Sequence, residues 1–278
     1  MNNYAVKVDN VFKSFKDETK NKIKKDFLSA LFSRTQNRFY AVNGVSFAID
    51  YGEIFGILGQ NGSGKSTLIR MISTLLTLEK GSISVFGYDI VKDEYKVKQH
   101  INRVTVEASF FKKLSAFENL MYAASIYGVP RDEAKSRINE ILGVLNLDLN
   151  RIHEPLENFS RGMQQKVAIG RAVLTSPSLL LLDEPTTGLD PKSKKDVQSF
   201  ILKVRKTNNT TVILTTHDME EADRICDRIA IIDKGKFITL NTPANLKNKF
   251  RKENETISLE DVFFEITGKE FKSDELEE

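Results

Sequence analysis

The stretch that decides the fold lies at residues 59–67 and reads GQNGSGKST. It matches the pattern G-x-x-x-x-G-K-[ST] and lies between an apolar run and a segment with helical periodicity at 66–76. Gly59, Gly62 and Gly64 allow a backbone path that brings the chain close to a ligand. The order of strand, glycine-rich loop and helix predicts a cradle for the phosphates of a nucleotide, facing the positive end of the helix.

The side chains of this phosphate cradle (residues 59–67) predict ATP and Mg²⁺ as cofactors. Lys65 would reach the terminal phosphates, and Ser66 would offer its hydroxyl to Mg²⁺. The residues expected to bind ATP are Gly59, Gln60, Asn61, Gly62, Ser63, Gly64, Lys65, Ser66 and Thr67.

A pair of carboxylates follows the apolar run LLLL at 179–182. A continuous apolar run is typical of a strand covered on both faces, and such a strand would hold Asp183 and Glu184 rigidly at one edge of a sheet. Asp183 suits Mg²⁺ or its bound waters, and Glu184 suits polarising a water for attack on a phosphate. Downstream of a phosphate cradle, this pair predicts hydrolysis of the nucleotide.

The composition is that of an ordinary globular protein and excludes several other classes. Among the 278 residues, 41 are Lys or Arg and 38 are Asp or Glu, and the net charge of +3 is too small to predict nucleic-acid binding. A single cysteine, Cys226, excludes an internal disulfide. We find no apolar run near the roughly 20 residues of a membrane span and no apolar core of a signal peptide, so we expect a cytoplasmic protein.

The pattern along the chain indicates an α/β fold with a helical insertion. Residues 6–11 alternate weakly and predict an edge strand, and residues 233–235 predict the turn of a closing hairpin. Other strands are expected at 42–47, 53–58, 82–86, 179–182, 211–214, 229–232 and 236–240, and helices at 66–76, 116–127 and 131–145.

Three more segments, taken with the phosphate cradle, resemble the nucleotide-binding subunit of ABC transporters. NFSRGMQQKVAIGRAV at 158–173 precedes the carboxylate pair, PTTGLD at 185–190 follows it, and TVILTTHD at 211–218 follows in turn. The resemblance covers roughly residues 4–245. It implies a P-loop NTPase core with a mixed sheet, an antiparallel edge sheet and a helical subdomain at about 105–175. We expect an ATPase domain at 1–245, followed by a C-terminal helix and polar tail at 246–278.

The resemblance also implies a site shared between two cassettes, in a homodimer or a pair of related chains. Ser160 and Gly162 match the loop that binds the γ-phosphate of ATP held by the other protomer. His217 matches a histidine that contacts the γ-phosphate, and Asp190 matches a loop that couples the two sites. With Lys65 and Glu184, His217 completes the expected catalytic set.

Two expected features of the family are harder to place. The family has a Gln that touches Mg²⁺ at the end of the strand before the helical insertion, and here that position falls on Val106 or Glu107. We assign it to Glu107, because a carboxylate can still meet Mg²⁺ or its waters. The aromatic residue that stacks on adenine matches Phe15 best, with Phe39 and Tyr40 as rivals.

Several details resemble the export branch of the family. Arg161 and Met163 replace the commoner Gly and Gln of the 160–163 loop, and SLEDVFFEITG at 258–268 resembles the ending of drug and sodium exporter cassettes. The helix expected there could equally pack on its own domain. The insertion at 17–38 resembles the gate helix of polysaccharide exporter cassettes.

Within the insertion, KNKIKKDFLSALFSR at 20–34 predicts a basic amphipathic helix. Its apolar face would contain Ile23, Phe27, Leu28, Leu31 and Phe32. Such a helix favours contact with a membrane surface or a partner, and the alternative is a surface helix folded on its own domain.

These features together predict an ATPase that drives export through a separate transmembrane subunit, positioned peripherally at the cytoplasmic face of the membrane. The alternative is a non-transport ABC ATPase that acts on nucleic acid or the ribosome. Such proteins usually carry two cassettes or long coiled coils, and we find neither in this sequence.

Overall fold

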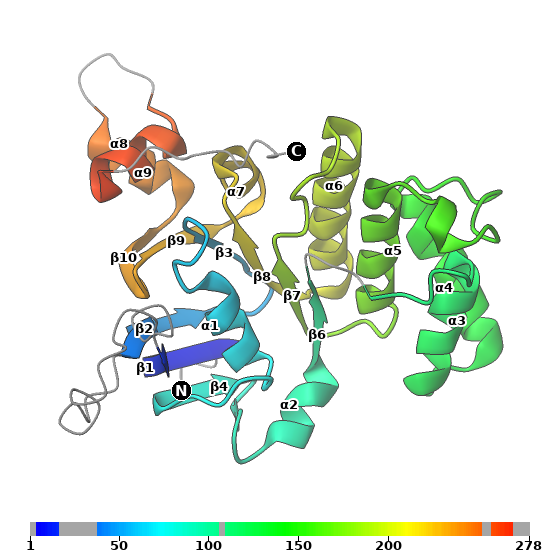
Figure 1. The fold of residues 1–278 in the computed structure, drawn as a ribbon, viewed down its shortest axis with the longest axis horizontal. Coiled ribbons are helices and arrows are strands. Elements are labelled where there is room, and N and C mark those ends of the chain that lie inside the picture. The colour runs from blue at the N-terminus through cyan, green and yellow to red at the C-terminus, as the bar shows by residue number, and fades with distance from the viewer. Residues whose placement is uncertain (1–3, 17–37, 106–108, 252–256, 269–278) are drawn as a thin grey trace, which may run out of the picture.

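The computed structural model describes residues 4–16, 38–105, 109–251 and 257–268. Within these residues the central sheet has the order β10-β9-β3-β8-β7-β6, parallel except for β10 (Figure 1). Its strands are β3 (Ile54–Leu58), β6 (Ile101–Val104), β7 (Leu179–Asp183), β8 (Thr211–Thr216), β9 (Arg228–Asp233) and β10 (Lys236–Asn241). Because β3 and β7 flank β8 in parallel, the loops that follow them meet at one edge of the sheet.

An antiparallel sheet of order β2-β1-β4-β5 stands beside the central one. Its strands are β1 (Val6–Lys16), β2 (Arg38–Ile49), β4 (Lys80–Val85) and β5 (Tyr88–Asp89). The prediction of an edge strand at 6–11 is wrong, because β1 lies between β2 and β4. Val6, Val8 and Val11 are buried while the residues between them are exposed, so the alternation reflects one covered face and not an edge position.

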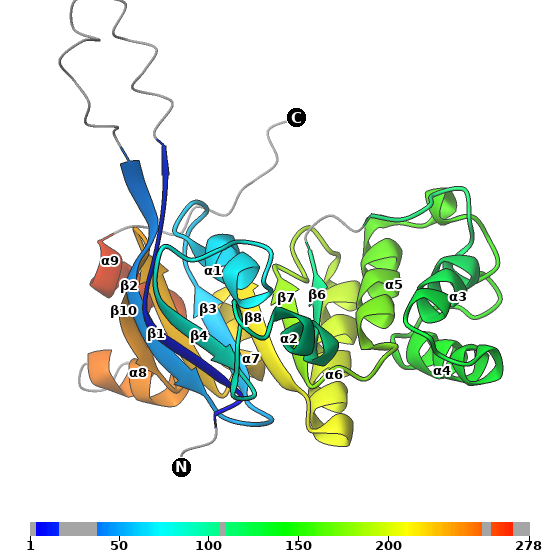
Figure 2. The same cartoon turned by 90° about the horizontal axis from the view of Figure 1, so that it is seen from below.

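Helix α1 (Lys65–Ile72) packs into the core between the two sheets (Figure 2). In the same core the rings of Phe47 and Phe55 stack at a centroid distance of 5.1 Å, which joins β2 to β3. The helix is shorter than the expected 66–76. It stops because Thr74 takes a left-handed φ of +62°, which turns the chain out of the helix.

The helical subdomain consists of three helices at the end of the molecule far from the antiparallel sheet (Figures 1 and 2). They are α3 (Ala116–Ile126), α4 (Arg131–Val144) and α5 (Arg161–Val173), with a short 3₁₀ turn, η2 (Leu156–Asn158), before α5. The subdomain has a hydrophobic core of its own, and α5 contributes both to that core and to the core of the central sheet. The predicted helical insertion is confirmed.

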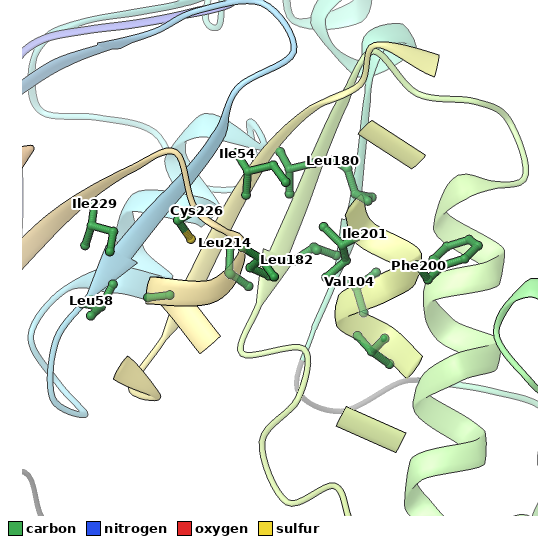
Figure 3. Close-up of a cluster of buried hydrophobic side chains, with 14 of the residues drawn as sticks. Ile54, Leu58, Val104, Leu180, Leu182, Phe200, Ile201, Leu214, Cys226 and Ile229 are labelled. Atoms are coloured by element: carbon green, nitrogen blue, oxygen red, sulfur yellow. The ribbon is translucent and has the colours of Figure 1, made fainter. Parts of the chain in front are cut away.

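Helices on the other face of the central sheet cover its second core, part of which Figure 3 shows. They are α6 (Pro191–Asn208), α7 (Met219–Ile225), α8 (Pro243–Phe250) and α9 (Leu259–Thr267), while α2 (Glu94–His100) precedes β6. Leu259, Val262 and Phe263 of α9 are buried in this core, so the C-terminal helix packs on its own domain. The division at residue 245 stays a prediction. No described helix combines the length and apolar character that crossing a bilayer requires.

The β9–β10 hairpin matches its prediction and supports the phosphate cradle. Lys234 and Gly235 both have positive φ, +47° and +77°, as a two-residue hairpin turn requires. The Gly235 N–H donates a hydrogen bond to the carbonyl oxygen of Ser63 at 2.9 Å. The hairpin therefore anchors the loop in which Ser63 lies.

Candidate active site

The phosphate cradle joins the carboxyl end of β3 to the start of α1. At Gly64, φ is +112°, and an added Cβ would lie 2.1 Å from the carbonyl oxygen of Ala41. A Cβ at Gly59 would lie 2.5 Å from the carbonyl oxygen of Ile232. These two glycines are required by close backbone approach, and the neighbouring strands β2 and β9 thereby fix the path of the loop.

Lys65 is held inside its own loop. Its Nζ donates to the carbonyl oxygens of Gly59 at 2.6 Å and Gln60 at 3.2 Å. It also lies 3.3 Å from Oε1 of Glu184, and the side chain is only 3% exposed. The ammonium therefore stands between the cradle and the carboxylate at the end of β7, where it can meet a terminal phosphate.

Ser66, Asp183 and Thr215 form the oxygen-rich corner of the site. The hydroxyls of Ser66 and Thr215 donate to Oδ1 of Asp183 at 3.0 and 2.7 Å. Mg²⁺ prefers a few protein oxygens together with phosphates and waters. The hydroxyl of Ser66 and the carboxylate of Asp183 fit that requirement, and no group of three or more His, Cys, Asp or Glu forms a closed cage among the described residues.

Thr215 was not predicted from the sequence. It enters the site because β7 and β8 pair in parallel with Asp183 directly opposite Thr215. The signal available in the sequence was a polar residue at the end of an apolar strand, TVILTT at 211–216, but its register with Asp183 comes only from the sheet.

Glu184 is the centre of a charged cluster. Its backbone has φ of +50°, and its Oε2 lies 3.2 Å from Nδ1 of His217 and accepts a hydrogen bond from the Thr187 hydroxyl at 3.2 Å. The hydrogen bond with His217 and the charge of Lys65 lower the pKa of Glu184 to about 2 although burial opposes the shift. Glu184 is therefore ionised, and its lone pairs face groups that a nucleotide would contact.

The same contact raises the pKa of His217 above its ordinary value, through the hydrogen bond with Glu184. The folded protein thus binds a proton more tightly at His217 than the unfolded chain does, where the pKa is about 6.5. The stabilising effect is fully present below about pH 6.5 and is lost as the pH rises through the folded value. The effect of Glu184 appears above its ordinary pKa of 4.5 and is constant at neutral pH.

We expect the stability difference between the nucleotide-free wild type and His217→Gln to grow as the pH falls from about 8 to about 6. Glutamine cannot take up the proton, so it lacks the contribution that depends on pH. Unfolding in denaturant at several pH values measures the difference. A difference that is flat, or that grows as the pH rises, would contradict the charged pair.

A cavity of about 230 Å³ opens beside the phosphate cradle. It is lined by Phe15, Phe39, Ala41, Asn61, Gly62, Gly64, Lys65, Ser66, Thr67 and Glu184. The rings of Phe15 and Phe39 lie 5.9 Å apart across the β1–β2 pair. The third candidate, Tyr40, packs edge-on against Phe12 and does not line this cavity. The structure thus brings two of the three predicted aromatic residues to the cradle.

Ser160, Gly162 and Asp190 gather at a second place, where α5 and α6 begin. Ser160 caps α5 by accepting from the Met163 N–H at 3.3 Å, and Asp190 caps α6 by accepting from the Ser193 N–H at 2.9 Å. A Cβ at Gly162 would lie 3.3 Å from Oδ2 of Asp190. Gly162 thus lies beside Asp190, and none of the three predicted residues lines the cavity at the cradle of its own chain.

Glu107 and the alternative Val106 lie outside the described residues, as does the insertion except for Arg38. Of the remaining predicted residues, Gln60 contacts Lys65 through its carbonyl oxygen, and Ser63 is a buried member of the loop.

The central mixed sheet, the cradle and the carboxylate pair define an ATPase domain of the P-loop class. The chain belongs to the ABC transporter family, whose sequence profile matches residues 42–187. The family assignment confirms the predicted ATPase class and fold.

Among its relatives, the linearmycin resistance ATP-binding protein LnrL of Bacillus subtilis (strain 168) is 43% identical over 205 residues, which are 74% of this chain and 65% of LnrL. The ABC transporter ATP-binding protein NatA of the same organism is 38% identical over 77% of this chain and 87% of NatA. The methionine import protein MetN 2 of Bacillus cereus is 36% identical over 76% of this chain and 63% of MetN 2. The chain thus spans less than two thirds of LnrL and MetN 2.

Solved structures agree with the fold. An ATP-binding subunit of an ABC transporter superposes with a TM-score of 0.76 at 26% identity, over 95% of this chain and 99% of that one. The cassette MJ0796, a dimer bound to ADP and Pi, superposes with a TM-score of 0.72 at 26% identity, over 85% of this chain and 98% of that one.

Proposed function

We propose that this chain binds and hydrolyses MgATP and thereby drives export through a separate transmembrane subunit. The observation that carries the proposal is the contact of Lys65 and His217 with Glu184 at the mouth of the phosphate cradle. In-line attack of water on a γ-phosphate uses a cation near the phosphate and a base for the water. Lys65 and Glu184 supply these groups within reach of the space beside α1, and His217 stands next to them.

In the proposed reaction, Glu184 accepts the proton of the attacking water and His217 contacts the γ-phosphate. With a pKa of about 2, Glu184 is a weak base in the nucleotide-free protein. When phosphate oxygens take over the contacts of Lys65 and His217, the lowering influence on Glu184 weakens and its basicity rises. Bound Mg²⁺ would supply charge for the phosphates next to Ser66 and Asp183. The base therefore gains strength only with its substrate in place.

We further propose that two cassettes share each ATP. Ser160 and Gly162 do not reach the cavity of their own chain, and Ser160 is exposed. The solved relative MJ0796 is dimeric, which supports this arrangement. The hydroxyl of Ser160 and the N–H groups at the start of α5 are suited to a γ-phosphate presented by a partner.

The assignment to export rests on sequence similarity. LnrL, at 43% identity, is named for resistance to linearmycin, whereas MetN 2, at 36%, is named for methionine import. The SRGM loop at 160–163 and the ending at 258–268, which resemble exporter cassettes, also favour export. A role at the cytoplasmic face of the membrane, as a peripheral subunit, follows from this proposal, and nothing supports action on nucleic acid.

The helical subdomain offers a surface for the transmembrane subunit, which we call the aromatic hollow. It has a volume of about 400 Å³ and lies between α3, α5 and β6. Its lining is Asn102, Arg103, Ser109, Phe110, Phe111, Asn119, Tyr122, Ala123, Ile126, Tyr127, Arg171 and Ala172. Among the described residues, Nη1 of Arg103 is buried without a hydrogen-bond partner. A partner segment with apolar side chains would pack against the aromatic lining. Exposed carbonyl or carboxylate oxygens on the same segment would accept the unused hydrogen bond of Arg103.

We expect Tyr122→Ser combined with Ile126→Ser to weaken co-purification with the transmembrane subunit by at least about tenfold, because two large exposed apolar contacts are lost.

Deletion of residues 19–36, bridged by a short Gly/Ser linker, should also impair assembly if the insertion docks as the sequence suggests. Co-expression with the transmembrane subunit, pull-down and export assays measure both.

ATP affinity of each purified variant is the control and should stay within about threefold of wild type. Tyr95→Ser is a matched surface variant on α2, outside the lining of the hollow, and should assemble normally. Normal assembly of the hollow variant would contradict docking there. Loss of ATP affinity in the deletion, with normal assembly, would assign the insertion to the nucleotide site instead.

A further inference from the structure

Glu221 is a buried acid whose carboxyl group accepts hydrogen bonds from neutral side chains. Its side chain is 1% exposed. Its Oε1 accepts hydrogen bonds from the Thr186 hydroxyl at 2.8 Å and, more weakly, from the Gln198 amide at 3.4 Å. Burial and the negative charge of Asp218 raise its pKa, while hydrogen bonds from Thr186, Thr216 and Gln198 oppose the shift. The partners are hydroxyl and amide groups that donate to the carboxyl oxygens, so they hold the side chain in place while burial favours its protonated form.

These contacts join three segments that surround the candidate active site. Thr186 lies two residues after Glu184, in the loop that leads to Asp190, while Gln198 belongs to α6. Glu221 itself stands one helical turn after His217. Its backbone N–H donates to Oδ1 of the capping residue Asp218 at 2.8 Å, so the position of Glu221 relative to the start of α7 is fixed.

The geometry of the charged cluster depends on this connection. Glu184 follows β7 and His217 follows β8, and their contact of 3.2 Å requires the loop after β7 and the start of α7 to keep their separation. If the acceptor at Glu221 were removed, the buried Thr186 hydroxyl would lose its partner, and its loop would have to move to restore one. A displacement of about 1 Å can cost a factor of about a hundred in rate.

We propose that Glu221 is a positioning residue for ATP hydrolysis, which holds the loop after Glu184 to the helix after His217. The inference rests on the proposed function, because it concerns the rate of the same reaction. Glu221 does not touch the nucleotide site itself, so its effect should fall on turnover and not on ATP binding.

The test compares MgATP turnover and ATP affinity in the full chain for four variants. Glu221→Leu removes the acceptor and should lower kcat at least about tenfold with ATP affinity within about threefold. Glu221→Gln keeps an oxygen that accepts from Thr186 in a side chain of nearly the same shape, so it should keep kcat within about twofold. Thr186→Val removes the donor from the same bond and should resemble Glu221→Leu. The exposed neighbour Glu220→Gln is the matched control.

The double variant Glu221→Leu with Thr186→Val decides whether the two residues act through one bond. Its kcat should be close to that of the lower single variant, whereas independent losses would multiply. Three results would each overturn the proposal. They are losses of kcat that multiply in the double variant, a wild-type kcat in Thr186→Val, and a kcat of Glu221→Gln as low as that of Glu221→Leu. If Glu221→Leu does not fold, the kcat values of the two single variants Thr186→Val and Glu221→Gln still decide the question. Absence of turnover in the wild type would instead remove the proposed function.

Discussion

Replacing Glu184 with glutamine is expected to lower ATP turnover by at least about a hundredfold and to leave ATP affinity within about threefold. A neutral amide cannot accept the proton of the attacking water, and general bases contribute roughly 10²–10⁴ in rate. The phosphate contacts of the cradle and of Lys65 stay available. Phosphate release and equilibrium binding of a fluorescent ATP analogue measure the two quantities separately.

The same variant should accumulate as an ATP-bound dimer. If Ser160 and Gly162 complete the site of a partner, ATP binding favours association by mass action, and blocked hydrolysis prevents reopening. Sedimentation with and without MgATP measures this. Turnover at the wild-type rate would remove Glu184 from the role of base. A monomer at saturating ATP would contradict a homodimer and leave a related cassette as the partner to test.

Replacing Gly64 with alanine is expected to weaken ATP binding by at least about a hundredfold. The new Cβ would lie 2.1 Å from the carbonyl oxygen of Ala41, so either the cradle or β2 must shift. The left-handed backbone alone costs about 1–2 kcal/mol of unfolding free energy for a residue with a side chain. Calorimetric titration with ATP and denaturant unfolding measure both effects.

Gly87→Ala is the matched control for this variant. Gly87 has φ of +83°, and no atom lies within 4 Å of an added Cβ. It should show the cost of the left-handed backbone without a clash, and normal ATP affinity. If Gly64→Ala bound ATP as tightly as Gly87→Ala does, the cradle would not depend on close contact with β2.

The parts of the site that were predictable from the sequence are local. The cradle is a contiguous loop whose glycine spacing reflects its own backbone, and Asp183 and Glu184 follow a strand that is recognisable by its unbroken apolar run. His217 and Ser160 required the additional resemblance to a family. The fold class followed from the same signals, since buried strands and amphipathic helices each leave a periodic trace.

The parts that were not predictable depend on how distant segments pair. Thr215 reaches Asp183 because of strand register, and Thr186 reaches Glu221 across 35 positions of sequence. The position of β1 inside its sheet also escaped prediction, because a strand with one covered face has the same alternation at an edge or between neighbours. A buried acid such as Glu221 looks like an ordinary surface residue of a helix until its neighbours are known.

The resting position of Lys65 has a consequence for selectivity. Its ammonium is already engaged by two carbonyl oxygens and one carboxylate, so an incoming anion must compete with ligands that the chain supplies itself. A lone inorganic phosphate offers few oxygens in exchange and gains little help from the rest of the loop. A triphosphate replaces these contacts while also using the remaining N–H groups of the cradle and the start of α1. The internal ligands thus lower the affinity for any anion that contacts Lys65 alone.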